Sequence, residues 1–429
     1  MSKTFRPWDV DQVWLLPPSI QELVPPGHLS HFVRETVRDG LDLSAILGSY
    51  AEERGYPPYH PGMMVALLLY AYSQGIYSSR RIARGCEERL DFAAVTGMQR
   101  PDFRTVSEFR RRHLGALSGL FVQVLKLCQA AGLVKLGHVA LDGTKIKANA
   151  SKHKAMSYRR MKQAEAALAA EVQGWLSQAA QADTAEDRQL GAERRGDEMP
   201  DWVADKQQRL AKIRAAKAAL EAEARAAAGD DDADGGGKAE ATVPDKAQRN
   251  FTDAESRIMK TKDGFIQGYN AQAAVDSEAQ VIVACGLTNA GSDQAQLVPL
   301  VEAVRANTGR HADEVSADAG YCSADNLRRL AWRRIEAYIA TGRQRHGTAA
   351  AVGRREHRPG IVATMALKLK RAGHRSRYRL RKQLPEPVFG QIKQARGFRQ
   401  FLLRGIEKVS GEWAMICTAH NLLKLARAA

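Results

Sequence analysis

The stretch HVALDGTKIKA, residues 138–148, carries the first clear strand signal of the chain. Val139, Ala140 and Leu141 form a short apolar run that leads into Asp142. Such a run predicts a buried β-strand. We expect Asp142 to close this strand, and the carboxyl ends of strands in an open α/β sheet are where ligands usually bind.

More strand and helix signals follow from residue 250 onward. Four further strands are predicted at FIQGYNAQAAVD (265–276), VIVACGLT (281–288), DEVSAD (313–318) and IEAYIAT (335–341). Ser292 or Asp293 can cap a helix. Its apolar spacing predicts a core face of Leu297, Leu300, Val301 and Val304. Later helices are predicted at about 323–333, 386–396 and 411–426.

The segment between the first and second strands has a different composition. Residues 156–228 are rich in Ala, Glu, Lys, Arg and Gln, and residues 191–200 interrupt this composition. The pattern predicts two long helices that form an antiparallel hairpin. The following stretch GDDDADGGGKAEATVP, residues 229–244, predicts a flexible acidic linker.

With the hairpin set aside, the predicted order is β-β-β-α-β-α-β-α. This is the order of an RNase H-like mixed sheet, in which the first and fourth strands lie side by side. The expected fold class is therefore α/β, with a helical-hairpin insert between strands 1 and 2 and an all-α domain before the sheet. The expected domains are a helical domain (1–125), a domain built on the sheet (136–155 and 250–429) and the insert with its linker (156–249).

The first 125 residues carry helical signals. Residues 61–73 are apolar on several faces and should be buried, whereas 78–89 and 105–113 begin or end with arginines. Short helices joined by Gly75 and Gly97 suit a helix-turn-helix module, with Arg80, Arg81 and Arg84 as DNA contacts. A small bundle that only supports the next domain explains the same pattern.

The positive charge is concentrated in one segment. The chain has a formal net charge of +16, yet residues 328–408 hold 22 Lys and Arg against four acidic residues. The rest of the chain holds 42 basic and 44 acidic residues. Segregation of this kind is expected where a polyanion binds. A basic surface kept for solubility is the alternative, but solubility gives no reason for the segregation.

Several protein classes are excluded by what the sequence lacks. Its longest apolar run, residues 63–72, is well below the ~18 residues that span a bilayer. The first 14 residues lack the pattern of a secretory signal, and the five cysteines form no CxxC pair. HExxH and P-loop motifs are also missing. We expect a cytoplasmic protein with no membrane contact.

Three acidic residues are the candidate catalytic and metal-binding residues. Asp142 and Asp318 close the first and fourth strands, and Glu386 opens the helix after the fifth. Carboxylates suit Mg²⁺, which activates water or a hydroxyl at phosphodiesters. Each residue also has a simple structural explanation: a turn for Asp142, a helix cap for Asp318 and a helix-start charge for Glu386. Lys393, seven residues after Glu386, would share its helix face and contact phosphate.

Five segments together resemble the DDE-class transposases of bacterial insertion sequences. They are YPPYHPGMMVALLLYAYSQGIYSSRRIA (56–83), LDGTKIKANAS (141–151), QRNFTDAESRIMKTKDGFIQGYNAQ (248–272), ADAGYCSADNL (317–327) and EPVFGQIKQARGFRQFLLRGIEKVSGEWAMICTAHNLLKL (386–425). The first is similar to the N-terminal domain common in that group.

The resemblance implies a catalytic domain in which Asp142, Asp318 and Glu386 bind Mg²⁺, with Mn²⁺ as an alternative. It also implies that the protein binds the terminal inverted repeats of its element, cleaves them and joins the freed 3′-hydroxyl to target DNA. A homodimer on DNA and a nucleoid-associated location in the bacterial cytoplasm are expected on the same basis.

The C-terminal signature of the family sets a tyrosine and a basic residue before the glutamate, and a lysine after it. Tyr378, Glu386 and Lys393 fit this pattern, and the basic residue is either Arg381 or Lys382. Two other functions remain open from the sequence. One is an inactive relative that regulates by binding DNA, and the other is an RNase H-like nuclease that only hydrolyses.

Overall fold

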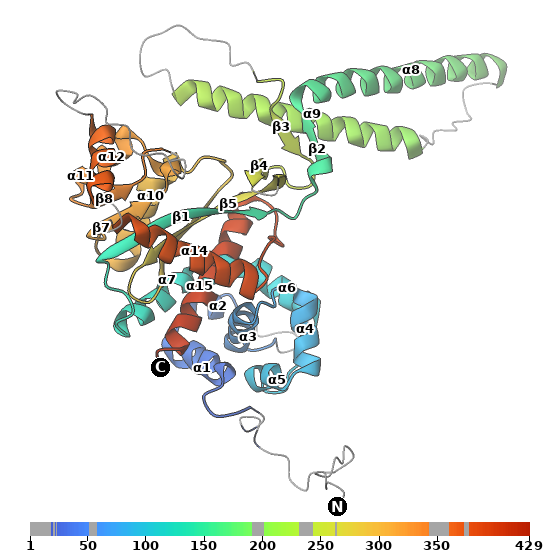
Figure 1. Ribbon diagram of the computed structural model, residues 1–429. Helices are drawn as coiled ribbons and strands as arrows, with labels where there is room; N and C mark the ends of the chain where they lie inside the picture. Colours follow the sequence, from blue (N-terminus) through green and yellow to red (C-terminus); the bar gives the residue numbers. More distant parts are fainter. Residues whose placement is uncertain are drawn as a thin grey trace, which may run out of the picture.

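The computed structural model describes residues 19, 22, 24–50, 58–190, 201–230, 243–261, 264–342, 360–372 and 377–429. A mixed sheet lies in the middle of the molecule, with N-terminal helices on one side and a long helical hairpin projecting from the other (Figure 1). The predicted hairpin interruption and most of the predicted linker lie outside the described residues.

Six strands form the main sheet. Their spatial order is β4-β5-β1-β7-β8, and β6 also pairs with β5. The strands are β1 (His138–Lys147), β4 (Arg257–Thr261), β5 (Gly264–Asp276), β6 (Ile282–Thr288), β7 (Glu314–Ala317) and β8 (Glu336–Ile339). The first half of β5 pairs with β4 and its second half with β6. The five strands expected from the sequence are all present, whereas β4 was not anticipated.

Strand β1 has neighbours of opposite direction. It pairs antiparallel with β5 from Val139 to Lys147, but parallel with β7 only from His138 to Ala140. The predicted pairing of the first and fourth strands is therefore confirmed. The prediction that Asp142 closes β1 is wrong, because β5 keeps pairing with β1 as far as Lys147. Asp142 lies instead where β1 and β7 separate.

The helices after β6 follow the expected order with two differences. Helix α10 (Leu297–Thr308) buries the predicted face, and Ser323 caps α11 (Ala324–Trp332). The helix expected at 386–396 is divided into α14 (Pro385–Gly390) and a π-helical turn, η8 (Gln391–Ala395). Helix α15 (Ile406–Ala426) covers the helix expected at 411–426, whereas α12 (Ile361–Ala372) and α13 (Leu380–Gln383) lie between β8 and α14 and were not expected.

The N-terminal helices share one core with the rest of the body. They are α1 (Leu29–Glu35), the π-helix η2 (Thr36–Gly40), α2 (Ser44–Leu47), α3 (Pro61–Ser73), α4 (Ser79–Glu88), α5 (Leu90–Thr96), α6 (Phe103–Arg112) and α7 (Leu114–Ala130). Helix α3 is buried as predicted. Helix α15 packs against α3, α7 and β6, so one cluster of buried apolar side chains runs from Val33 to Leu425.

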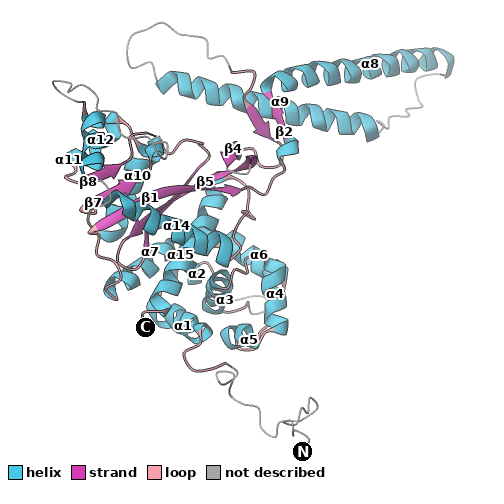
Figure 2. Ribbon diagram, in the orientation of Figure 1, coloured by secondary structure: helices cyan, strands magenta, loops and turns pink. Residues whose placement is uncertain are grey.

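The helical hairpin is a separate unit with its own small core. Its helices are α8 (Tyr158–Leu190) and α9 (Asp201–Asp230), as the composition predicted. Their buried cluster consists of Met161, Ile213, Ala216 and Leu220. A two-stranded ribbon of β2 (Ala155–Ser157) and β3 (Gln248–Asn250) connects the hairpin to the body (Figure 2). Among the described helices, none has the length and apolar character that crossing a membrane requires.

Candidate active site

Asp142 is a largely buried carboxylate on β1. Its side chain is 13% exposed, and its Oδ1 accepts a hydrogen bond of 2.9 Å from the Gly143 N–H. Burial raises the pKa of Asp142 from 3.8 to about 7. The positive charge of Arg381 opposes this rise, whereas the carboxylates of Asp318 and Asp293 add to it. Asp142 is therefore one of several acidic groups that are close enough to influence one another.

Asp318 follows the last residue of β7. Its Oδ1 accepts a hydrogen bond of 2.8 Å from the Gly320 N–H and so caps the short 3-10 turn η5 (Ala319–Tyr321). The capping role anticipated from the sequence is present. Asp318 nevertheless lies near the other residues of the candidate site, because its carboxylate raises the pKa of both Asp142 and Arg381.

Arg381 lies between Asp142 and Glu386. Its Nη2 is 3.7 Å from Asp142 Oδ2 and 3.9 Å from Glu386 Oε1. Burial alone would lower the pKa of Arg381, but Asp142, Tyr378 and Asp318 raise it. Glu386 is in the first turn of α14 and its side chain is 52% exposed. Residues from three separate segments thus meet around one guanidinium group.

The other residues of the C-terminal signature, Tyr378, Lys382 and Lys393, lie in different places relative to the carboxylates. Tyr378, in the 3-10 turn η7 (Arg377–Arg379), interacts with Arg381. Lys382 is exposed, so the structure brings Arg381 and not Lys382 to the carboxylates. Lys393 reaches β1, where its Nζ donates to Thr144 Oγ1 at 2.6 Å and to the Lys145 carbonyl at 3.1 Å. Burial, and secondarily Arg399, lowers the pKa of Lys393.

Asp293 belongs to the acidic group, although the sequence indicated only a helix cap for it. Neither Ser292 nor Asp293 caps α10 itself, because the N-cap residue of this helix is Gln296. The Asp293 side chain is directed toward β5. Its Oδ1 accepts hydrogen bonds of 2.6 Å from Asn270 Nδ2 and from Gln272 Nε2. The available signal was the pair Asn270 and Gln272 in a mostly apolar strand, because buried amides need partners.

Tyr321 and two glycines complete the surroundings of Asp293. The Tyr321 hydroxyl donates to Gln272 Oε1, and burial together with Asp293, Asp142 and Asp318 raises the pKa of Tyr321. A Cβ on Gly143 would lie 2.4 Å from Gln272 Nε2 and 2.7 Å from Asp293 Oδ1. One on Gly320 would lie 2.9 Å from Asp318 Oδ1 and 3.2 Å from Asp293 Oδ2. Both positions therefore need glycine for this packing.

The residues suit a divalent cation chemically. Asp142, Asp318 and Glu386 are oxygen donors of the kind that Mg²⁺ and Mn²⁺ prefer. Arg381 supplies positive charge among them. Within the described ranges, however, no group of three or more His, Cys, Asp or Glu side chains is arranged to hold a metal ion.

The arginines expected to contact DNA lie on α4, away from the carboxylates in the fold (Figure 1). Arg80, Arg81 and Arg84 are all exposed. The Arg80 guanidinium lies 5.2 Å from the centre of the Phe103 ring, and Arg84 Nε is 2.6 Å from Glu88 Oε1. Arg81 is near enough to Tyr77 to oppose the rise in the pKa of Tyr77 that burial causes.

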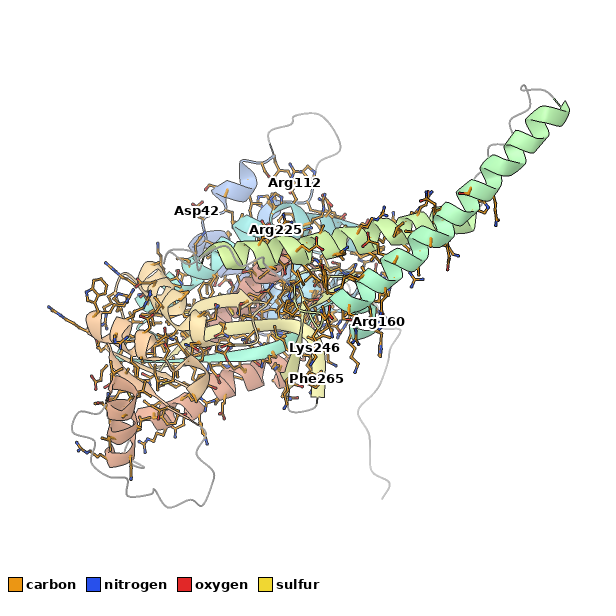
Figure 3. All side chains as sticks on the ribbon, turned by 90° about the horizontal axis from the view of Figure 1, so that it is seen from above. Asp42, Arg112, Arg160, Arg225, Lys246 and Phe265 are labelled. Carbon is orange, nitrogen blue, oxygen red and sulfur yellow. The ribbon has the colours of Figure 1, made fainter. Side chains whose placement is uncertain are left out.

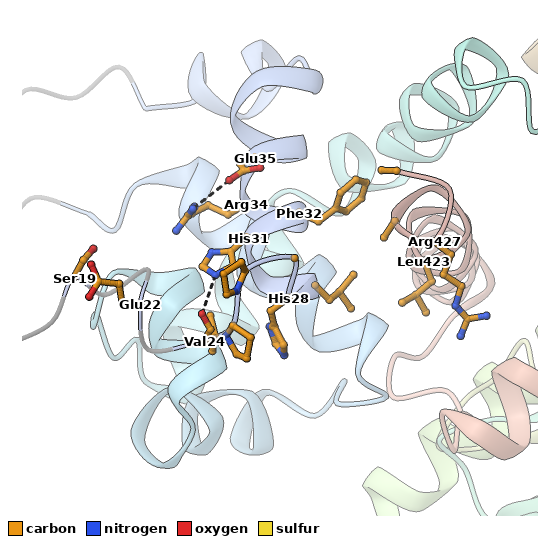
Figure 4. Close-up of a pocket in the computed structure, with 16 residues that line it drawn as sticks. Ser19, Glu22, Val24, His28, His31, Phe32, Arg34, Glu35, Leu423 and Arg427 are labelled. Carbon is orange, nitrogen blue, oxygen red and sulfur yellow. Dashed lines mark hydrogen bonds and ion pairs between the residues drawn. The ribbon is translucent and has the colours of Figure 1, made fainter.

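A hollow of about 910 Å³ lies apart from these carboxylates, between α1 and the end of α15 (Figure 4). His31 Nε2 is 3.5 Å from the Val24 carbonyl oxygen, and Arg34 forms an ion pair with Glu35. None of the catalytic or DNA-binding residues expected from the sequence is among the described residues that line it. This hollow is therefore not the candidate active site.

Two family models match the chain. Residues 18–112 match a transposase domain (DUF772), and residues 240–422 match a transposase DDE domain. Asp318, Arg381, Glu386 and Lys393 lie within the second match, whereas Asp142 lies outside both. Comparisons with curated proteins and with solved structures found no match.

Proposed function

Because the chain belongs to the DDE-class transposases of insertion sequences, we propose that it cleaves the terminal inverted repeats of its element and joins the ends to target DNA. The observation that supports this most directly is the meeting of Asp142, Asp318 and Glu386 around Arg381. Three carboxylates face one guanidinium group there, and a bound divalent cation would offset the excess of negative charge.

The strand order supports an RNase H-like catalytic domain. The β6-β5-β1 part is antiparallel, and β7 and β8 continue from β1 in parallel. Numbered along the chain without β2, β3 and β4, the order is 3-2-1-4-5. The hairpin of α8 and α9 would then be an insert between the first two strands, and residues 136–155 and 250–429 would form the catalytic domain.

The three carboxylates would hold the divalent cation, Mg²⁺ or Mn²⁺. A cation bound there would activate the attacking group and stabilise the leaving oxygen. Arg381 would then bind the scissile phosphate. Its Nη2 already faces Asp142 and Glu386, and a guanidinium group has further N–H donors that suit phosphate oxygens. Tyr378 would orient Arg381, and Lys393 would contact a neighbouring phosphate.

The proposed chemistry has two steps at one site. Water attacks phosphorus at the element end and loses a proton as its oxygen bonds to phosphorus. The bond from phosphorus to the 3′ oxygen breaks, and that oxygen takes up a proton to become the 3′-hydroxyl. This hydroxyl then attacks phosphorus of a target phosphodiester, loses its proton and forms the new bond, while the 3′ oxygen of the target leaves and takes up a proton. Asp293, held by Asn270 and Gln272, would keep the neighbouring carboxylates in position.

Nicking of supercoiled plasmid in the presence of Mg²⁺ tests the proposal. The variants D142N, D318N and E386Q should each lose cleavage and keep DNA binding, measured on the same samples. D325N is a matched control, because Asp325 is exposed on α11 and pairs with Arg329 at 2.7 Å. Cleavage by D142N at the wild-type rate would refute the assignment of the site.

Two rival functions give different results in the same assays. An inactive DNA-binding regulator would bind plasmid and never nick it with Mg²⁺ or Mn²⁺. A nuclease that only hydrolyses would nick but yield no strand-transfer products with pre-cut ends. Inverted repeats in the DNA on both sides of the reading frame would support the transposase.

DNA binding and assembly form the second part of the proposal. The exposed Arg80, Arg81 and Arg84 on α4 would read the terminal repeats. Two element ends need two active sites, so we propose a homodimer on DNA. The hairpin would contact the second subunit or the DNA, and its many Ala and Glu residues favour the subunit slightly.

A further inference from the structure

A hollow of about 670 Å³ lies near the end of β1, and Lys145, three residues after Asp142, is one of its lining residues. Five basic side chains line it: Lys145, Lys147, Lys152, Lys393 and Arg399. None of the described residues that line it is acidic. We call this hollow the cationic groove. Charge of one sign on the walls of a cleft attracts a polyanion.

The walls of the cationic groove are held together by backbone pairing. The Phe401 N–H donates to the Lys147 carbonyl at 2.8 Å, and the Lys147 N–H donates to the Arg399 carbonyl at 3.3 Å. Gln400 Nε2 also donates to the Ala148 carbonyl at 3.1 Å. The segment after η8 is therefore fixed to the end of β1, so the backbones that carry Lys147 and Arg399 keep their spacing before any ligand arrives.

An exposed aromatic ring stands at the far wall. Phe265 lines the cationic groove at the start of β5, opposite Lys260 of β4, and is 61% exposed. Figure 3 labels it at the end of the hairpin of β4 and β5. Packing against the body of the protein does not explain why an aromatic side chain lies at this exposed position. Aromatic side chains beside a cationic track are the usual means of stacking on bases of single-stranded nucleic acid.

We propose that the cationic groove binds a DNA strand next to the active site, with its phosphates along Lys147, Lys152 and Arg399 and an unpaired base stacked on Phe265. The proposal rests on the proposed function, because it concerns the DNA on which that site acts. It adds the path of the strand from Asp142 along the end of β1 to the hairpin of β4 and β5.

Binding of a fluorescent DNA duplex with a single-stranded extension tests the groove, measured by anisotropy on the full chain with EDTA present so that no cleavage occurs. The double variant K147Q/K152Q should lower the slope of log affinity against log salt by roughly 1.4 to 1.8. F265A should weaken binding of the extended probe about fivefold or more and leave the slope unchanged. F265W should bind as the wild type does.

Two controls match these variants. Lys126 is exposed on α7 and Trp332 is 81% exposed on α11, and neither lines the cationic groove. K126Q and W332A should therefore bind like the wild type. A thermal unfolding curve for each variant separates lost binding from lost folding. In addition, 2-aminopurine in the extension should change its fluorescence on binding to the wild type and not to F265A.

If the folded variants K147Q/K152Q and F265A bind DNA with the affinity and the salt slope of the wild type, the proposal that the cationic groove binds DNA is wrong. If the wild type still nicks plasmid with Mg²⁺, the proposed function survives that result. Equal weakening by K126Q or W332A would also overturn the groove, since binding would then be general. A wild type that neither binds DNA nor nicks it would instead overturn the proposed function.

Discussion

At the scale of the residue, Arg381 is the side chain that connects the carboxylates of the candidate active site. It stands between two carboxylates that lie 244 positions apart in the sequence numbering, Asp142 and Glu386. The neighbouring Lys382 is exposed, and spacing alone did not separate the two. The guanidinium group is planar and offers several donors in a fixed arrangement, which a lysine cannot replace.

Replacing Arg381 should therefore affect the chemistry more than replacing Lys382. R381Q and R381K should each slow Mg²⁺-dependent plasmid nicking by about tenfold or more, since a hydrogen bond to a charged group contributes roughly 1.5–3 kcal/mol. K382Q is the matched control and should nick at nearly the wild-type rate. If K382Q nicks plasmid slowly and R381Q nicks at the wild-type rate, Lys382 and not Arg381 has the proposed role in catalysis.

Glu412 of α15 is a second residue with a measurable effect, on stability. It is fully buried, and its carboxylate accepts hydrogen bonds of 3.0 Å from the N–H groups of Leu402 and Leu403. Burial raises the pKa of Glu412 from 4.5 to about 7, against these hydrogen bonds and the charge of Arg110. The folded protein thus holds this proton more tightly than the unfolded chain does.

The stability contributed by this proton is fully present below pH 4.5 and is lost as pH rises through about 7. E412Q should remove a pH dependence of roughly 3 kcal/mol across that window, at about 1.4 kcal/mol per pKa unit. Denaturant unfolding at about pH 5 and about pH 8 measures it. E407Q, exposed on the same helix, should keep the wild-type dependence. An unchanged pH dependence in E412Q would contradict this account.

At the scale of the element, the helical hairpin is the most independent part. Its buried cluster of Met161, Ile213, Ala216 and Leu220 does not join the main core. Glu223 of α9 reaches the rest of the chain through Arg249 at 2.6 Å and Arg257 at 2.9 Å. Partly exposed ion pairs of this kind contribute about 1 kcal/mol or less.

Removing the hairpin should leave the body folded. A variant in which an Asn-Gly turn joins Ser157 to Gln248 keeps the register of β2 and β3. We expect its thermal unfolding midpoint to shift by less than about 4 °C. If the hairpin contacts a second subunit, light scattering of the DNA complex should show one protein copy where the wild type shows two. An insoluble variant would contradict the separation of the two cores.

At the scale of the whole molecule, the N-terminal helices and the sheet are closely joined. The Tyr77 hydroxyl donates to the Gly397 carbonyl at 2.6 Å, and its ring packs edge-on against Phe398 at 4.9 Å. Gly75 has φ +73°, and a Cβ there would lie 2.4 Å from the Arg396 carbonyl oxygen. The start of α4 is thus held against the segment that becomes a wall of the cationic groove.

Truncation should therefore unfold the protein instead of releasing a catalytic domain. Deleting residues 1–130 removes α3 and α7 and uncovers the face of α15 that they cover, including Asn421, whose carbonyl oxygen accepts from Cys128 Sγ of α7 at 3.7 Å. We expect the remaining chain to be insoluble or to unfold without a cooperative transition. Limited proteolysis of the full chain is the parallel measurement, and it should yield no stable fragment beginning near residue 136. A soluble, cooperatively unfolding truncation would show that the sheet folds alone.

The amino-acid sequence by itself determined the elements whose signal is local. The strands at 138–147, 264–276 and 282–288 and the helices of the hairpin follow from apolar runs and composition, which depend on near neighbours. The elements β2, β3, β4 and α13 were not predicted, because each lies in a segment dominated by polar and charged residues. The choice of Asp142, Asp318 and Glu386 came from motifs, and their roles stay predictions.

Only the tertiary structure decided which side chains meet. It brought Arg381 and not Lys382 to the carboxylates, and it turned Asp293 toward Asn270 and Gln272 where the sequence indicated a cap. It also merged the N-terminal helices with α15 into one core. These outcomes depend on pairing between segments far apart in the chain, for which neither periodicity nor composition along the sequence carries information.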